Sequence, residues 1–260
     1  MTTSQNKSLL QSVQNGLLLL KVFSKDRPVW GITDISRELQ LPKSTVSRLV
    51  GDLIKEGYLQ KIGSKYRLGL SILCLAGVNM SNLEIHREAF EPLKSLVSKI
   101  DESAHISMLE GIQLIYLLKV ECKQRVRLLS HVGQYRPPSC SSSGKLLLAY
   151  QPREIIDQVI KNGLPKRGPN SVTDPDQLLD ELTTIKQNEY CVCIDEMHDD
   201  VVSIASPIKD YTGKVTASVS IAGPRQRIHE EFIPYFIDEI IKTGNEISYR
   251  LGYMESLFNK

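Results

Sequence analysis

The chain has 260 residues, of which 41% are hydrophobic and 24% are charged. These proportions are typical of a globular protein and exclude a disordered chain or a small disulfide-stabilised domain. At this length we expect one large or two unequal domains, and no apolar run approaches the roughly 18 residues of a membrane-spanning helix.

The first residues are polar and lead into no apolar segment with a cleavage-like site, so we expect no secretory signal. The five cysteines are odd in number and include no C-x-x-C pair. That usage fits reduced thiols better than a disulfide framework. We therefore expect a cytoplasmic protein that has no membrane partner.

The formal net charge of +2 hides an asymmetry along the chain. Residues 1–78 contain 11 lysines and arginines against 5 aspartates and glutamates, which is a net charge of +6, whereas the remainder contains 21 against 25, which is −4. A basic N-terminal part on a mildly acidic body indicates that nucleic acid is the partner of the N-terminal part.

Three helical segments open the chain. Apolar residues at spacings of three and four predict an amphipathic helix over residues 8–24, and a shorter helix follows over 34–40 with Thr33 as its cap. Pro42 opens a third helix that runs to about residue 56. The predicted core face of this helix consists of Val46, Leu49, Val50, Leu53 and Ile54.

Two short strands, over residues 58–62 and 65–68, follow the third helix. Three helices and a hairpin in this order predict a winged helix-turn-helix, whose third helix enters the major groove of DNA while the wing approaches the backbone. A solvated face is the alternative for the third helix, and a surface salt bridge is the alternative for Arg67. The predicted DNA-binding residues are Thr33, Lys43, Ser44, Thr45, Ser47, Arg48, Lys65 and Arg67.

The pattern changes after residue 70. A helix over 71–78 leads into a helical stretch over 79–100 that Pro92 interrupts, and the domain boundary is expected near Met80. Strands are then predicted over 104–109, 113–120, 125–131, 203–209 and 215–222, with a further short strand around Cys191 and Cys193. Helices are predicted over 142–150, 152–162, 174–188 and 228–251. This mixed order predicts an α+β fold with an antiparallel sheet.

Several strings of residues carry a family resemblance. Pro-Lys-Ser-Thr-Val-Ser-Arg-Leu occupies residues 42–49, Ser-Gly-Lys occupies 143–145, Val-Ser-Ile-Ala-Ser-Pro-Ile occupies 202–208, and Ser-Val-Ser-Ile-Ala-Gly-Pro occupies 218–224. With these strings in this order, the chain resembles the IclR family of bacterial transcriptional regulators from about residue 10 to residue 253.

The resemblance implies a winged helix-turn-helix DNA-binding domain at residues 1–78, a linker helix at 79–92 and a GAF-like effector-binding domain at 93–260. It also implies homodimers or dimers of dimers that bind palindromic double-stranded DNA operators and respond to a small-molecule effector. Carried over to this chain, the residues of the effector pocket are Ser142, Ser143, Cys193, Val201, Ser203, Ser220 and Ala222.

This predicted pocket departs from the commoner pattern of the family. Residues 140–143 read Cys-Ser-Ser-Ser where many relatives have a histidine or cysteine followed by small apolar residues, Cys193 stands in place of an aspartate, and Ser203 replaces a frequent cysteine. Serine hydroxyls and free backbone N–H groups at a helix start would suit a carboxylate or another anion. Helix capping is the alternative role for these serines.

Two other kinds of site are weighed against this hypothesis. Ser142, His131 and Asp195 are residue types of a hydrolase triad, but the chain has no G-x-S-x-G turn. We therefore predict no catalytic residue. The function predicted is a DNA-binding regulator of a catabolic or metabolic operon, controlled by a small organic acid. The alternatives are a small-molecule-processing enzyme with an accessory basic domain and a protein-interaction adaptor.

A metal site is the second alternative. Cys191, Cys193 and His198 could hold a metal, but alternate residues of a strand do not by themselves create tetrahedral geometry. Buried thiols explain these cysteines better. We therefore expect neither a metal nor a cofactor.

Overall fold

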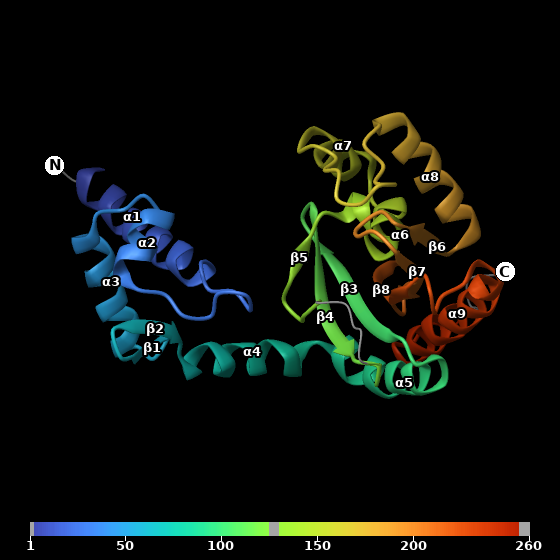
Figure 1. The fold of residues 1–260 in the computed structure, drawn as a ribbon, viewed down its shortest axis with the longest axis horizontal. Coiled ribbons are helices and arrows are strands. Elements are labelled where there is room, and N and C mark those ends of the chain that lie inside the picture. Colours follow the sequence, from blue (N-terminus) through green and yellow to red (C-terminus); the bar gives the residue numbers. More distant parts are fainter. Residues whose placement is uncertain (1–2, 125–129, 255–260) are drawn as a thin grey trace. The chain divides into compact units, whose positions relative to one another are not determined.

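The computed structural model describes residues 3–124 and 130–254. The chain divides into two compact units, Met1–Asn82 and Leu83–Lys260 (Figure 1). Each unit buries a hydrophobic cluster of its own. Within the described ranges, no helix combines the length and the apolar character needed to cross a lipid bilayer.

The first unit consists of three helices and a two-stranded antiparallel hairpin, followed by a further helix. Its elements are α1 (Thr3–Lys21), α2 (Ile32–Glu38), α3 (Lys43–Lys55), β1 (Leu59–Ile62), β2 (Lys65–Leu68) and α4 (Leu70–Asn82). This order confirms the predicted winged helix-turn-helix. The predicted capping role of Thr33 is wrong, because α2 begins at Ile32 behind Gly31 and Thr33 lies inside its first turn.

A small core joins the helices of this unit to the hairpin. All five predicted core-face residues of α3 are buried or partly buried in it. Trp30 is also buried, and its backbone exchanges two hydrogen bonds with Tyr66 of β2 at 2.8 and 2.9 Å. The hairpin is therefore anchored to the helices by both packing and backbone hydrogen bonds.

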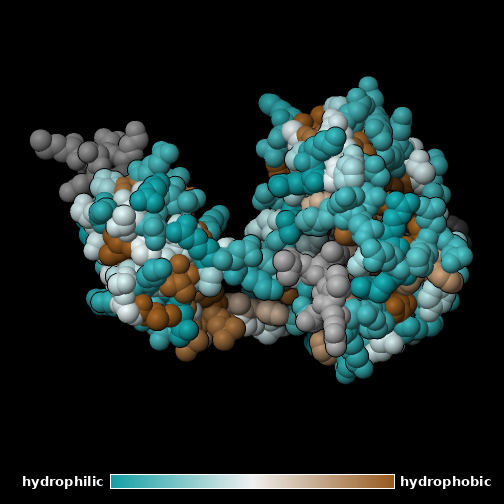
Figure 2. Space-filling view, in the orientation of Figure 1, coloured by the Kyte–Doolittle hydropathy of each residue, from teal (hydrophilic) through white to brown (hydrophobic). Residues whose placement is uncertain are grey.

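The helix α4 follows the hairpin after a sharp turn. Gly69 permits this turn, because a Cβ atom there would collide with the backbone carbonyl of Gly57. The hydroxyl of Ser71 then donates to the carbonyl of Glu56 at 3.0 Å. The helix contains no charged residue, yet none of its residues is buried. Hydrophobic side chains are visible along its surface in Figure 2.

The second unit is a six-stranded antiparallel sheet with helices on both faces (Figure 1). The strand order is β5-β4-β3-β8-β7-β6. The strands are β3 (Ser103–Glu110), β4 (Gln113–Val120), β5 (Tyr135–Arg136), β6 (Cys191–Ile194), β7 (Val201–Lys209) and β8 (Val215–Pro224). The helices are α5 (Glu84–Ile100), α6 (Ser142–Ala149), α7 (Arg153–Lys161), α8 (Pro175–Asn188) and α9 (Ile233–Arg250).

The two faces of this sheet have different neighbours. Alternate residues of a strand point to opposite faces, so Ile204 and Ile221 pack with α5 and α9, whereas Cys191, Cys193 and Ala205 pack with α6, α7 and α8. We call the face that carries these last three residues the α6 face. The observed α+β architecture with an antiparallel sheet confirms the predicted fold class.

Several element boundaries differ from the prediction. The helical stretch expected over 79–100 is divided at Leu83 between α4 and α5, and Pro92 lies buried inside α5 without interrupting it. The last helix begins at Ile233, because residues 230–232 form a turn of 3₁₀ helix. The strand predicted over 125–131 falls mostly outside the described residues, and β5 had no predicted counterpart.

Candidate functional site

The exposed side of α3 carries the predicted recognition residues. Lys43, Ser44, Ser47 and Arg48 are exposed and Thr45 is half-buried, while the opposite side of the helix is buried in the core. Neither Lys43 nor Arg48 has a carboxylate partner among the residues that the structure describes. Two cations and three hydroxyls on one helix face are suited to contact phosphates and base edges.

The hairpin adds two exposed cations, Lys65 and Arg67, both on β2. The guanidinium of Arg67 donates two hydrogen bonds to the side-chain oxygen of Gln60 across the hairpin, at 2.9 and 3.1 Å. Gln60 is neutral, so the charge of Arg67 is not compensated by this contact. Thr33, the eighth predicted DNA-binding residue, is exposed in the first turn of α2.

Five predicted effector residues lie together on the α6 face of the sheet. Cys193, Ser203 and Ala222 form one row across β6, β7 and β8. Ser220 occupies the next row, and Val201 shares this face because it is two residues from Ser203. Residues scattered over 30 positions of the sequence are therefore neighbours through antiparallel pairing.

The other two predicted effector residues begin α6. Ser141 caps this helix, and its Oγ accepts a hydrogen bond from the backbone N–H of Gly144 at 3.2 Å. Ser142 and Ser143 follow in the first turn, and their backbone N–H groups have no acceptor among the described residues. Because α6 contacts β6, β7 and β8, these N–H groups belong to the helix that covers the α6 face.

The same face also carries a strip of buried polar residues that we did not predict from the sequence. His105 and Ser107 of β3 stand opposite Ser220 and Ser218 of β8. The hydroxyls of Ser107 and Ser218 are buried and have no hydrogen-bond partner in the described part of the chain. Buried hydroxyls without a protein partner are groups that a ligand or a water molecule satisfies. In the sequence, this strip is indicated by the alternation His-x-Ser at 105–107 and Ser-x-Ser at 218–220.

His105 lies at the centre of a buried hydrogen-bonded group. Its Nε2 atom is 2.7 Å from the hydroxyl of Ser130, and its ring centroid is 5.0 Å from that of Tyr116. The Nζ atom of Lys119 donates to the carbonyl of Ser130 at 2.8 Å. Burial, reinforced by the positive charge of Lys119, lowers the pKa of His105 to about 3. The imidazole is therefore neutral at neutral pH.

This lowered pKa predicts acid sensitivity of the second unit. The unfolded chain binds a proton at His105 below its ordinary pKa of 6.5, but the folded chain does so only near pH 3, so stability is complete above pH 6.5 and decreases as the pH falls. Between pH 6.5 and 5 we expect His105 to account for a loss of about 1.5 kcal/mol in the free energy of unfolding. Urea titrations at both pH values, followed by far-UV circular dichroism, measure this loss in the free energy of unfolding.

Replacement of His105 by Gln should remove most of this pH dependence. The matched control is His198→Gln, because burial also lowers the pKa of His198 but this side chain lies exposed at the surface. An acid-induced loss of the same size in His105→Gln and in the wild-type chain would contradict the assignment.

Lys145 is buried on α6 between two carboxylates. Its Nζ atom lies 2.6 Å from Glu181 and 2.5 Å from Glu196. Burial disfavours the charged ammonium, but the two carboxylates outweigh that effect, so the pKa of Lys145 is raised above its ordinary value. The charge of Lys145 is therefore compensated, and its two ion pairs link α6 to α8 and to the loop after β6.

The two thiols of β6 are buried side by side. The Sγ atoms of Cys191 and Cys193 are 3.8 Å apart, and burial raises the pKa of Cys193 well above its ordinary value. The thiol of Cys193 is therefore not a ready thiolate ligand. Within the described ranges, no group of three histidine, cysteine, aspartate or glutamate side chains is arranged to hold a metal ion.

Two cavities of the second unit have volumes of about 490 and 420 Å³. The first lies beside β5 and the end of α7, and the second beside α8. None of the seven predicted effector residues lines either cavity. The structure brings those seven residues to one face of the sheet and its covering helix, separate from the walls of these two cavities.

Comparisons with known proteins match both units. A family model described as the IclR helix-turn-helix domain matches residues 12–63, and one described as the bacterial transcriptional regulator IclR C-terminal matches residues 78–249. The chain belongs to the IclR family. It is thus a transcriptional regulator with a DNA-binding helix-turn-helix domain and a C-terminal effector domain.

Curated relatives and solved structures agree with this membership. The chain is 31% identical to the HTH-type transcriptional regulator KipR of Bacillus subtilis, over 96% of this chain and 99% of that protein. It is 27% identical to KdgR of Escherichia coli, over 92% of each chain. An IclR homologue of Microbacterium hydrocarbonoxydans, crystallised with 4-hydroxybenzoate, superposes with a TM-score of 0.84 at 26% identity, over 92% of this chain and 98% of that one. KipR and KdgR are both named as HTH-type transcriptional regulators.

Proposed function

We propose that this IclR-family regulator binds a palindromic operator as a homodimer or a dimer of dimers, and that a small organic acid bound at the α6 face controls it. The DNA-binding part of the proposal rests on Lys43 and Arg48, which lie on the exposed side of α3 and have no carboxylate partner in the described part of the chain. Thr33 and the hydroxyl residues of α3 complete the recognition surface, and Lys65 and Arg67 contact the backbone. Such a regulator of a catabolic or metabolic operon acts in the bacterial cytoplasm.

The effector site is proposed at the seven predicted residues. The backbone N–H groups of Ser142 and Ser143, which meet no acceptor in the residues that the structure covers, suit a carboxylate, because the start of a helix carries partial positive charge. The hydroxyls of Ser107 and Ser218, which have no hydrogen-bond partner within residues 3–124 and 130–254, offer polar contacts close to Ser220. The 4-hydroxybenzoate bound by the Microbacterium homologue is an acid of the same class.

The dimer is proposed to form through α4. A helix that is hydrophobic on all sides is ordinarily buried, yet Leu70, Leu73 and Val78 are exposed in the single chain. A second copy is the partner that fits, because two uncharged helices of the same sequence pair without charge repulsion. Pairing also brings two recognition helices to the two halves of a palindrome.

The DNA-binding part is tested at Arg48. Replacement by Ala should weaken binding to an operator selected from random-sequence DNA by about 1–3 kcal/mol, because a guanidinium that reads a base edge contributes that much discrimination. Gel-shift titration of the full chain at fixed salt measures the change. Arg153→Ala serves as the control, since Arg153 is exposed on α7 of the second unit. Equal affinities of Arg48→Ala and wild type would remove Arg48 from the interface.

The effector part is tested at Ser143. We expect Ser143→Leu to keep operator binding but to lose the response to the organic acid, because the larger side chain fills the space in front of the first turn of α6. The probe is whichever acid of a panel, 4-hydroxybenzoate included, raises the melting temperature of the wild-type chain most. Calorimetric binding of that acid to the variant with unchanged affinity would refute this placement.

A further inference from the structure

The strand β6 forms one edge of the six-stranded sheet (Figure 1). It pairs with β7 on one side, and no other strand of the described chain pairs with its second side. Natural sheets commonly protect such an edge with lysine, proline or a bulge. The four residues of β6 include no charged residue and no proline, and their ladder with β7 has no register shift. The sequence of β6 therefore leaves this edge open to pairing.

The pairing register identifies the backbone groups on the open edge. The N–H of Asp195 donates to the carbonyl of Val201 at 2.8 Å, so every second residue of β6, counted back from Asp195, directs its N–H and C=O groups toward β7. Val192 and Ile194 direct theirs outward. The side-chain amide of Asn170 donates to the carbonyl of Ile194 at 3.2 Å. The N–H and C=O of Val192 have no partner within the two described ranges, so they offer a donor and an acceptor to an added strand.

A groove borders this open edge. The cavity of about 420 Å³ is lined on one side by Cys191 and Val192 of β6, and on the other by residues of α8 that include Thr184 and Ile185. The cavity thus lies between the end of the sheet and its covering helix, and we call it the β6–α8 groove. None of the seven residues proposed for the effector lines it.

The β6–α8 groove is acidic. Three carboxylates line it, those of Asp180, Glu181 and Glu196, and its described lining includes no lysine, arginine or histidine. The single ammonium group of Lys145 is shared between Glu181 and Glu196. Asp180 has no cationic partner in the part of the chain that the structure describes. The groove therefore carries net negative charge, and it suits a cationic occupant.

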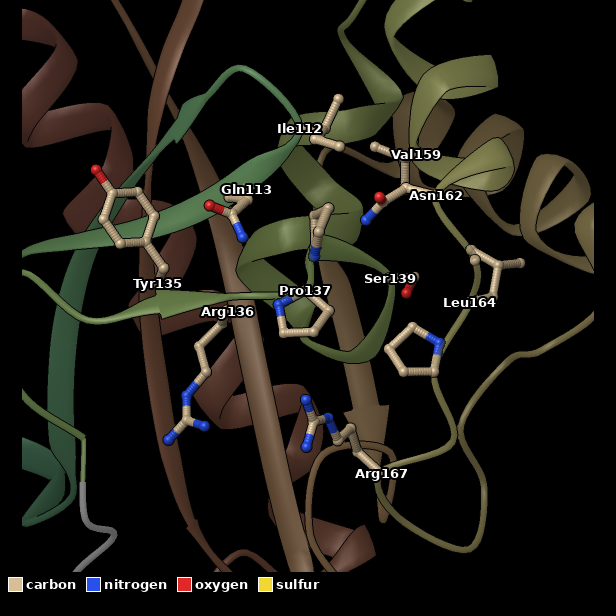
Figure 3. A pocket seen from close by; sticks show the side chains of 13 residues that line it. Ile112, Gln113, Tyr135, Arg136, Pro137, Ser139, Val159, Asn162, Leu164 and Arg167 are labelled. Carbon is tan, nitrogen blue, oxygen red and sulfur yellow. The ribbon is translucent and has the colours of Figure 1, made fainter. Parts of the chain in front are cut away.

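The other cavity of this unit has the opposite character. The cavity of about 490 Å³ is lined by two arginines, Arg136 and Arg167 (Figure 3). An occupant of the β6–α8 groove is therefore distinguished by its charge from any anion that is drawn to those arginines.

The open edge and the carboxylates together define the occupant. An edge strand is completed by backbone N–H and C=O groups, which an extended peptide has and a simple cation lacks. A second copy that paired through its own β6 would bring a second set of the same carboxylates to the interface, and like charges in contact repel. An extended segment that carries lysine or arginine satisfies both the edge and the carboxylates.

We infer that the β6–α8 groove binds an extended, lysine- or arginine-bearing segment of a partner protein, which adds a strand to β6 at Val192 and places a basic side chain against Asp180. The groove includes none of the recognition residues proposed for DNA. The interaction is therefore additional to operator and effector binding, and it depends on neither of them.

The test uses the full chain and a fluorescently labelled, capped hexapeptide of alternating lysine and valine. Anisotropy titration at fixed salt should show saturable binding of this peptide. A peptide with glutamate in place of lysine should bind about tenfold more weakly or less, because the charge-assisted contacts are lost. A fully N-methylated lysine peptide should not bind, because it keeps the charge but has no backbone donors. Hydrogen exchange of residues 190–194 should slow when the lysine peptide is bound.

Asp180→Lys should weaken binding of the lysine peptide by about tenfold or more, because it places like charges against each other. Asp238→Lys is the matched control, since Asp238 is also an exposed aspartate within a helix, α9, but does not line the groove. It should bind the peptide as the wild type does. Circular dichroism checks that both variants keep the fold.

Four results would overturn the proposal. They are absence of saturable binding to the wild-type chain, equal binding of the N-methylated peptide, unchanged affinity in Asp180→Lys, and an equal loss in Asp238→Lys. Equal binding of the N-methylated peptide would indicate a contact with the cation alone. Sedimentation velocity adds one further check, because dissociation of an oligomer by the peptide would assign the edge to a second copy of the chain instead.

Discussion

Replacement of Lys145 by Met should lower the free energy of unfolding of the second unit by about 3 kcal/mol or more. Lys145 is 1% exposed and Glu196 is buried beside it. Without the ammonium group, the carboxylate of Glu196 loses the charge that compensates it at a buried position. Urea denaturation followed by far-UV circular dichroism measures the loss.

The chain contains its own control for this experiment. Its single tryptophan, Trp30, is buried in the core of the first unit, so tryptophan fluorescence reports that unit and should show an unchanged transition. Lys161→Met, at an exposed position of α7, should change neither signal. Adding Glu196→Gln to Lys145→Met should recover part of the stability, because this second substitution removes the uncompensated carboxylate of Glu196. A wild-type transition in Lys145→Met would contradict the role of this cluster.

Replacement of Leu73 by Glu should convert the proposed dimer to monomers and lower operator affinity by about a hundredfold or more, because two linked recognition helices gain that much from binding together. Leu73 is 68% exposed on α4 of the single chain, so the substitution need not disturb the fold of the first unit. Sedimentation velocity measures the oligomeric state, and gel-shift titration measures the affinity.

Tyr211→Glu is the matched control, since Tyr211 is equally exposed but lies in the turn between β7 and β8. It should leave both measurements unchanged. A Leu73→Glu chain that sediments as the wild type does would show that α4 is not the contact between copies. Loss of dimerisation with full operator affinity would separate the two parts of the proposal and refute the avidity argument.

The N-terminal unit could be predicted almost completely from the sequence. The periodic apolar residues of α3, the proline before it and the glycine after it act over a few residues, so their consequences are local. The wrong prediction at Thr33 is also local. Gly31 and Thr33 are both possible N-caps of α2 and lie two positions apart, and the backbone conformation places the cap at Gly31.

The α6 face could be predicted only in part. The serines at the start of α6 and the strands β7 and β8 carry recognisable strings, so Ser143 and Ser203 could be named in advance. The partnership of His105 with Ser130 joins residues 25 positions apart, and that of Lys145 with Glu181 joins residues 36 apart. Neither pair has a local signature, because antiparallel register and helix packing create these contacts.

The sequence by itself determined the fold class, the charge division between a basic first unit and an acidic second unit, and the exposed cations of α3. These properties follow from residue spacing and charge, which do not depend on distant parts of the chain. Only the tertiary structure decided that His105 is held neutral and that Lys145 is compensated. Burial and pairing depend on which residues the sheet and its helices bring together, and no short stretch of sequence contains that information.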